Sequence, residues 1–114
     1  KRKFDHDIYD YYLQDNIKIK KPIVTKYGKS NYSYYPIILK SESECINLYE
    51  TFKKHNISSR RYFYPCLSTL EFVKSKKMKT SNSISKKILC LPLYYDLKKS
   101  DIKKICKLIL NTLK

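Results

Sequence analysis

The first residues of the chain show apolar side chains at helical spacing. Because residues three and four apart share one helix face, this spacing predicts an amphipathic helix over residues 4–14. Its inward side chains are expected to be Phe4, Ile8, Tyr11 and Tyr12. The polar residues between them are expected on the solvent side: Asp5, Asp7, Asp10 and a surface histidine, His6.

The strongest helix signal in the chain follows Ser41. Ser41 and Glu44 have the spacing of a capping box, in which the serine accepts a hydrogen bond from the third helical amide. The predicted helix closes at His55 and Asn56. Its apolar face is expected to contain Cys45, Leu48, Tyr49 and Phe52.

Two further helices are expected in the last third of the chain. Residues 83–89 predict a short helix with Ile84 and Ile88 inward, and Ser100 is expected to cap a final helix. The apolar stripe of that final helix is Ile102, Ile105, Cys106, Ile109 and Leu113. The apolar patch at residues 67–73 indicates one helical turn, and the polar residues 74–82 indicate a loop.

Aromatic and β-branched residues predict the strands. Residues 32–39 are the clearest strand, with Pro36 at a sheet edge or strand start because proline cannot donate to a ladder. Residues 57–64 are expected to be the next strand, and residues 17–24 a short one. A strand, helix and strand within about thirty residues is typical of an α/β or α+β unit. We expect a few-stranded sheet with helices packed on it.

Composition and charge limit the class of protein. A chain of 114 residues is one small domain, in which roughly two thirds of the unfolded surface becomes buried. The net charge of +15 suggests a nucleic-acid partner, but the lysines are spread along a chain without alanine or tryptophan. That pattern is typical of an AT-rich genome, so we expect no specific nucleic-acid binding. No apolar run approaches the roughly 20 residues that cross a bilayer.

The four cysteines do not indicate a metal site. They contain no C-x-x-C pair and no nearby histidine cluster, so zinc is not expected. Cys45 and Cys106 fall on apolar helix faces, where a free thiol packs as a small hydrophobe. No signal peptide precedes them, so we expect a reducing, cytoplasmic location.

The candidate binding chemistry lies in residues 60–65, Arg-Arg-Tyr-Phe-Tyr-Pro. Guanidinium groups pair with phosphate in a bidentate way, and aromatic faces stack on a base or a sugar. Pro65 fixes its own φ and favours an extended Tyr64, so the run is expected to be a held loop or strand end. The alternative is a strand leaving the core, with solvated arginines and packed tyrosines. No catalytic motif is visible, and the two histidines are far apart.

The order of these motifs resembles the DegT/DnrJ/StrS-type sugar aminotransferases. The matching runs are YYPIIL, the capped helix, R-x-Y-F-Y-P and then ILCLPLY before an Asp-Ile helix. They resemble the C-terminal segment of that family, in the subgroup acting on thymidine-diphosphate-linked keto-deoxysugars. The similarity covers residues 32–114 well and residues 1–31 in general character. Many relatives have a histidine shortly after the R-x-Y-F-x-P run, where this chain has Cys66, Leu67 and Ser68.

The resemblance implies a specific function and fold. Such enzymes are homodimers that use pyridoxal phosphate to move an amino group from glutamate to a 3- or 4-keto-6-deoxysugar nucleotide, for polysaccharide or glycan synthesis. Their cofactor lysine lies in a large N-terminal domain, so this segment alone is expected to bind no cofactor and to catalyse nothing. We expect residues 1–31 to be a helix and linker and residues 32–114 the small C-terminal domain. The expected substrate contacts are Arg60, Arg61, Tyr62, Tyr64, Tyr34 and Tyr35.

Two other functions compete with this interpretation. A strand, helix and strand with aromatic residues and high charge is also found in small RNA-binding modules, although the chain lacks their glycine-containing aromatic motif. The second competitor is a stand-alone regulatory or partner-binding domain. Neither has a catalytic role.

Overall fold

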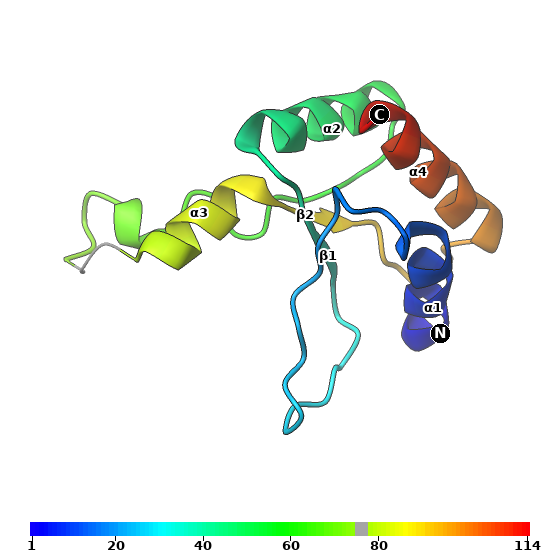
Figure 1. Cartoon of the computed structure of the whole chain (residues 1–114), viewed down its shortest axis with the longest axis horizontal. Coiled ribbons are helices and arrows are strands. Elements are labelled where there is room, and N and C mark those ends of the chain that lie inside the picture. The colour runs from blue at the N-terminus through cyan, green and yellow to red at the C-terminus, as the bar shows by residue number, and fades with distance from the viewer. Residues whose placement is uncertain (75–77) are drawn as a thin grey trace.

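The computed structural model describes residues 1–74 and 78–114, which form an α+β domain (Figure 1). The helices and strands follow one another as α1 (Arg2–Leu13), β1 (Tyr35–Ile38), α2 (Glu42–Lys54), a 3₁₀ turn (Leu67–Thr69), α3 (Lys79–Lys87), β2 (Ile88–Leu91) and α4 (Lys99–Thr112). The strands pair antiparallel, with Tyr35 opposite Leu91 and Ile38 opposite Ile88. The expected fold class is confirmed.

A single hydrophobic core joins the sheet to three of the helices. Helix α1 packs beside α4, while α2 lies against α4 and β2 (Figure 1). Helix α2 contributes Cys45, Leu48 and Phe52, all fully buried as their spacing predicts, while Tyr49 is partly buried against the core. Ser41 caps this helix by accepting a hydrogen bond from the Glu44 amide at 3.2 Å. The predicted stripe of α4 is also buried: Ile102, Ile105, Cys106, Ile109 and Leu113.

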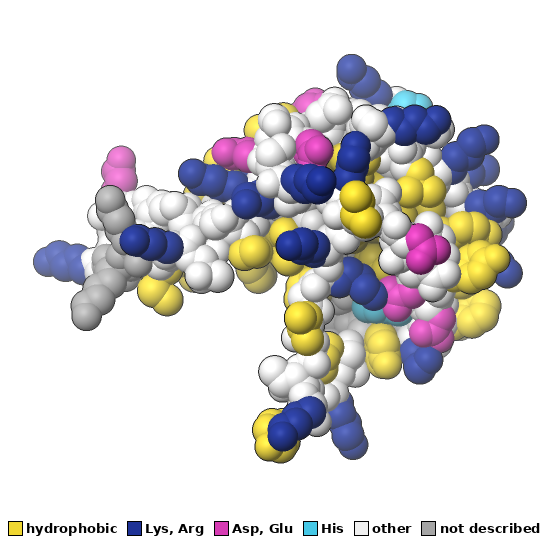
Figure 2. Space-filling view, in the orientation of Figure 1, with side chains coloured by type: hydrophobic (Ala, Val, Ile, Leu, Met, Phe, Trp, Pro, Cys, Tyr) yellow, Lys and Arg dark blue, Asp and Glu magenta, His cyan; other side chains and the backbone are white. Residues whose placement is uncertain are grey.

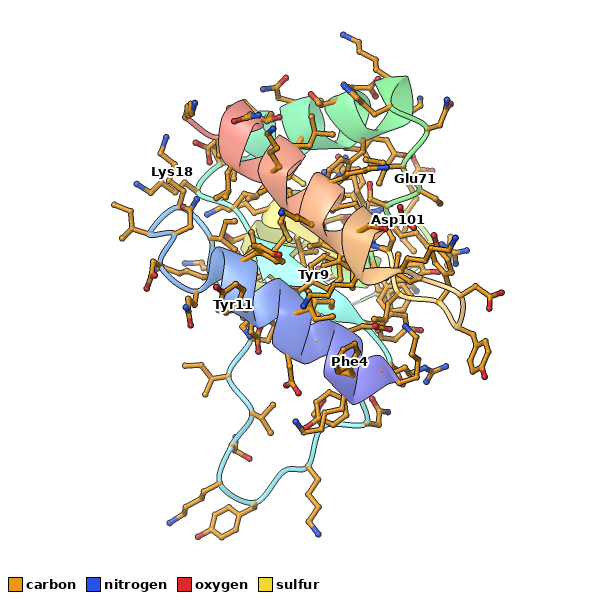
Figure 3. All side chains as sticks on the ribbon, turned by 90° about the vertical axis from the view of Figure 1, so that its right-hand side faces the viewer. Phe4, Tyr9, Tyr11, Lys18, Glu71 and Asp101 are labelled. Atoms are coloured by element: carbon orange, nitrogen blue, oxygen red, sulfur yellow. The ribbon has the colours of Figure 1, made fainter. Side chains whose placement is uncertain are left out.

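Helix α1 forms where predicted, but its buried face differs from the expected one. Phe4 and Tyr11 are 58% and 69% exposed, whereas Tyr9 is fully buried and its hydroxyl donates to the Pro92 carbonyl at 2.9 Å (Figure 3). Asp5 is also buried, contrary to prediction, and the Lys1 ammonium pairs with its carboxylate at 2.7 Å. The paired charge allows an acid to face the core, which hydrophobic periodicity alone does not anticipate.

His6 is half-buried and not a surface residue. Its ring lies edge-on to Tyr32 and Tyr35 at centroid distances of 5.0 and 4.9 Å. Nε2 is buried without a hydrogen-bond partner, and desolvation lowers the pKa of this imidazole. The histidine therefore packs as a neutral ring against two tyrosines.

Two predicted strands do not form. Residues 17–24 make only a single bridge, between Lys20 and Ile38, because Pro22 lacks the amide that would extend the ladder. Residues 57–64 make only the bridge between Arg60 and Cys90. The chain then turns, with the Tyr64 amide donating to the Arg61 carbonyl at 3.0 Å.

The boundaries of the last two helices also differ from prediction. Helix α3 begins at Lys79, inside the predicted loop, and ends at Lys87 because Ile88 pairs with Ile38 as a strand residue. Residues 75–77 of that loop lie outside the described residues. Helix α4 begins after Lys98, not Ser100, and its first residue has no side-chain cap. Burial of Leu97 fixes the chain just before this helix.

Two segments project from the body and are named here the first and second arms. The first arm is residues 17–34, and the second is residues 61–74 with 78–87. Figure 1 shows them leaving the sheet in different directions. The radius of gyration is 14.8 Å, larger than the roughly 13 Å expected of a compact chain of this length. The arms account for this excess.

A polar cluster holds the base of the first arm. The Asp10 carboxylate accepts hydrogen bonds from the Lys21 ammonium and, at 2.5 Å, from the Tyr35 hydroxyl. Burial acts to raise the pKa of Asp10, but these two hydrogen bonds outweigh it and the net pKa is lowered. The Lys21 ammonium also lies 5.3 Å from the centre of the Tyr35 ring. The cluster thus ties α1, β1 and the arm together.

Asp10→Asn is expected to destabilise the chain by on the order of 1 kcal/mol at neutral pH. A lowered folded-state pKa means that ionised Asp10 stabilises the fold above the unfolded pKa, near 4, and loses this effect as the pH falls through the folded pKa. The difference in unfolding free energy between the two proteins should therefore be constant above about pH 5 and shrink below about pH 4. Urea unfolding at several pH values measures it.

Asp7→Asn is the matched control for this prediction, since Asp7 pairs with Lys3 in solvent on the same helix. Its effect should stay below about 0.5 kcal/mol. Equal effects of the two substitutions would contradict a stabilising role for the cluster.

Candidate functional site

A groove with a volume of about 880 Å³ runs between α4 and the segment 55–62 that follows α2. Its floor includes Cys90, Leu91 and Pro92, while Lys104 and Lys107 of α4 form one side. Three of the predicted site residues line it: Tyr34, Arg60 and Tyr62. The groove therefore combines an apolar floor with cationic and aromatic walls.

The backbone of Arg60 is held by two hydrogen bonds, and its side chain is exposed. Its amide donates to the Cys90 carbonyl at 3.1 Å, and its carbonyl accepts from the Cys90 amide at 2.7 Å. The exposed guanidinium donates to the Tyr62 hydroxyl and lies 5.4 Å from the centre of that ring. Because one phenol occupies only part of the guanidinium, donors stay available for an anion.

Tyr62 and Tyr34 form an aromatic pair beside this guanidinium. Their rings meet edge to face, with centroids 5.4 Å apart. The Phe63 ring also stacks on Tyr62, with the two centroids 5.1 Å apart. Such a cluster offers a ring face and phenolic hydroxyls to a planar or sugar-bearing ligand.

Arg61 and Tyr64 lie outside the groove and form a different contact. The Arg61 guanidinium lies 3.8 Å from the centre of the Tyr64 ring, donates to the Lys86 carbonyl at 3.2 Å and approaches Glu42 at 3.8 Å. Its side chain is only 18% exposed, and its Nε is buried without a partner. These contacts connect the segment after Arg60 to α2 and α3, which is a structural role.

Tyr35 points away from the groove. It is 2% exposed in the core, its ring lies 4.6 Å from that of Tyr9, and its hydroxyl donates to Asp10. Tyr34, the residue just before β1, lines the groove, whereas Tyr35, the first residue of the strand, faces the core. Burial raises the pKa of Tyr35, which keeps the hydroxyl protonated as a donor.

Sequence reasoning missed Lys104 and Lys107. Among many lysines, nothing marks these two except a spacing of three on the polar face of α4, which places both on one side of the helix. Asp101 and Asn111 of the same helix also line the groove. Only the packing of α4 beside β2 and the segment 55–62 reveals that this face borders a cavity.

The described residues show binding chemistry and no catalytic constellation. Nowhere in residues 1–74 and 78–114 do three or more metal-binding side chains gather. The same residues include no helix long and apolar enough to cross a membrane. The groove can bind an anion next to an aromatic or sugar ring.

A family model described as the DegT/DnrJ/EryC1/StrS aminotransferase family matches residues 1–110. The chain belongs to this family. The resemblance seen in the capped helix and the R-x-Y-F-Y-P run is therefore confirmed. The match includes α1, whose buried residues share one core with the rest of this aminotransferase-family domain.

Two curated relatives have the same printed name, dTDP-4-amino-4,6-dideoxy-D-glucose transaminase. The one from Escherichia coli is 39% identical over 90 residues, which is 72% of this chain and 24% of the relative. The one from Shigella dysenteriae is 37% identical over 79 residues, 64% of this chain and 21% of the relative. This family member thus spans about a quarter of the length of the curated relatives it matches.

Solved structures of aminotransferases show the same fold. The aminotransferase TlmJ from Streptoalloteichus hindustanus superposes with a TM-score of 0.86 at 18% identity, covering 98% of this chain and 30% of that one. A putative sugar aminotransferase from Streptococcus pneumoniae superposes with a TM-score of 0.83 at 20% identity, covering 97% of this chain and 29% of that one. The structure of DesI in the presence of its TDP-sugar product superposes with a TM-score of 0.83 at 19% identity, covering 99% of this chain and 31% of that one.

Proposed function

We propose that this chain is the C-terminal domain of an aminotransferase that moves an amino group from glutamate to a nucleotide-linked 3- or 4-keto-6-deoxysugar. The nucleotide is proposed to be thymidine diphosphate, and the product to serve glycan or polysaccharide synthesis. The observation that carries the proposal is the family match over residues 1–110. The names of the two curated relatives support the nucleotide and the deoxysugar.

The lining of the groove supports this proposal. Arg60 would pair with the diphosphate, and Tyr34 and Tyr62 would contact a sugar or base ring. Lys104 and Lys107 add positive charge along the same groove. Arg61, Tyr64 and Tyr35 would support the fold and not contact the substrate, since their contacts lie within the domain.

The chain's own residues do not fit a pyridoxal phosphate site. The group supplies electron-sink chemistry to an enzyme that holds it through one sequestered lysine with partners for its ring and phosphate. No lysine in the described ranges is buried. The cofactor of the full-length enzyme would therefore belong to a separate, larger N-terminal domain. We further propose a cytoplasmic homodimer for that enzyme.

The test is an activity assay of the full-length enzyme, with the 114-residue chain as a comparison. The full-length enzyme should be converted by glutamate to its aminated form and should then aminate a dTDP-linked keto-deoxysugar. The isolated chain should give no borohydride-trappable adduct with pyridoxal phosphate. A stoichiometric adduct on one lysine of the isolated chain, or a full-length enzyme that reacts with glutamate and with no nucleotide sugar, would refute the proposal.

A further inference from the structure

His6 lies where helix α1, the first arm and strand β1 meet. Its ring is edge-on to Tyr32, at the returning end of the arm, and to Tyr35, the first residue of β1, at centroid distances of 5.0 and 4.9 Å. Figure 2 shows basic, acidic and histidine side chains gathered where the arm meets the body. A single imidazole therefore contacts both the end of the arm and the start of the strand.

Tyr32 has a backbone conformation that few residues other than glycine adopt. Its φ is 55°, in the left-handed region, where the side chain crowds the backbone. A tyrosine persists there only where surrounding contacts hold it. Two such contacts are the packing of its ring on His6 and the hydrogen bond from its amide to the Ser30 hydroxyl at 3.1 Å. Of these two, the His6 ring is the one that belongs to the body of the domain.

The strained residue is two positions from the candidate groove. Ser33 and Tyr34 line the groove, and the Tyr34 ring meets Tyr62 edge to face at 5.4 Å. Tyr35, on the other side of Tyr34, is 2% exposed and fixed in the core. The backbone of Tyr34 is therefore held between a buried strand residue and a strained one. Release of Tyr32 would move the aromatic wall of the groove, because one residue separates the two tyrosines.

The surroundings of His6 favour a neutral ring over a charged one. Among the described residues, no group bonds to Nε2, which is buried. The titratable side chains that face the ring are the α1 carboxylates of Asp5, Asp7 and Asp10, Lys21 and Tyr32 on the first arm, and Tyr35 on β1. Each of the three carboxylates already pairs with a lysine, which weakens its attraction for a further proton on the ring.

Desolvation outweighs these carboxylates, so the pKa of His6 is lowered from its ordinary value of 6.5. A lowered pKa in the folded state means that the neutral ring has its full stabilising effect above about pH 6.5. The effect is lost as the pH falls through the lowered value. Uptake of a proton then leaves a charge against two tyrosine edges, whose partial positive charge repels it.

We propose that His6 is a positioning residue for the groove: its neutral ring holds Tyr32 and thereby sets the place of Tyr34, and protonation of the ring releases both. Binding that uses Tyr34 then weakens as the pH falls below neutrality. The identity of the bound ligand, a nucleotide sugar, rests on the proposed function. The movement of Tyr34 does not, because it is a property of the domain without ligand.

A single tryptophan in the groove wall tests the proposal, since the chain contains none. In the 114-residue chain carrying Tyr34→Trp, tryptophan emission is followed from about pH 8 to about pH 5, while NMR follows the ring protons of both histidines. The lowered pKa of Asp10 keeps that carboxylate ionised over this range. We expect the emission to shift in one step whose midpoint coincides with the titration of His6 and lies below about pH 6.5.

Two variants in the same background assign the shift to one histidine. His6→Phe keeps an aromatic ring between the two tyrosines and removes the titrating group, so it should abolish the shift. His55→Gln is the matched control, because His55 is the other histidine of the chain and lines the groove itself. This variant should preserve the shift and its midpoint.

Other outcomes overturn the proposal. An emission that stays constant over the pH range would mean that Tyr34 does not follow His6. A shift that survives His6→Phe, or that disappears in His55→Gln, would assign the response to another group. A midpoint different from the NMR titration of His6 would do the same, and this comparison holds even if His6→Phe does not fold.

Circular dichroism of the same samples separates local release from unfolding. The helical signal should stay constant through the step, and its loss at the same midpoint would overturn the proposal, because the whole domain would then unfold. These measurements contain no ligand. A full-length enzyme that fails to use a nucleotide sugar would therefore refute the proposed function and leave the coupling of His6 to Tyr34 intact.

Discussion

Arg60→Ala in the full-length enzyme is expected to lower kcat/KM for the nucleotide sugar by roughly 30- to 150-fold. The reason is geometric: two hydrogen bonds to Cys90 fix the Arg60 backbone and hold its guanidinium at the groove. Its loss would leave the diphosphate of the proposed substrate without this paired donor. The half-reaction with glutamate should stay near wild type, because it does not use the sugar nucleotide. Steady-state and single-turnover kinetics measure the two half-reactions separately.

Arg61→Ala is the matched control, since the neighbouring arginine makes its contacts within the domain. Removal of its contacts with Glu42, Lys86 and Tyr64 should lower the melting temperature and leave kcat/KM close to wild type. Arg60→Ala should show the reverse, because its side chain is exposed. If Arg60→Ala lowers only the melting temperature, or if it slows both half-reactions equally, then Arg60 is part of the scaffold.

Phe52→Ala is expected to lower the unfolding free energy of the 114-residue chain by about 3–5 kcal/mol. Phe52 is fully buried on α2, and the truncation leaves a cavity among neighbours that the capped helix holds in place. For a domain of this size such a loss removes much of the total stability. Urea denaturation followed by circular dichroism measures the change.

Phe4→Ala provides the same chemical change at an exposed position. Phe4 is on α1 and 58% exposed, so its truncation should cost less than about 1 kcal/mol. This pair also tests the corrected orientation of α1. A large loss of stability in Phe4→Ala would instead mean that Phe4 faces the core, as hydrophobic spacing alone predicts.

Local sequence patterns predicted the helices better than the strands. The capping box at Ser41 and the apolar stripe of α4 each depend on residues three or four positions apart, so both can be recognised in the sequence alone. The predicted strands at residues 17–24 and 57–64 depend on pairing with residues far along the chain. Each of these segments makes only one isolated β-bridge. On α1, Ile8 is buried as predicted, whereas the burial of Asp5 accompanies its pairing with Lys1, which periodicity treats as two solvent-facing charges.

The candidate site was predictable in its residue types and not in its geometry. Residues 60–65 supply both the groove and its support, and the sequence alone does not distinguish Arg60 from Arg61. The backbone bridge to Cys90 fixes that distinction, since the two neighbouring side chains leave the chain in different directions. Lys104 and Lys107 enter the site only through tertiary packing.

The pairing of β1 with β2 has a consequence for the rate of folding. The two strands are about fifty positions apart in the sequence, with α2 and the second arm between them. Closing so long a loop costs entropy before any ladder hydrogen bond forms, which slows folding relative to a helical bundle of this size. Helix α2 has its cap and apolar face in place locally, so it can serve as the early surface on which both strands condense. Phe52, one of the three buried residues on that surface, then influences the rate of folding as well as the stability of the folded domain.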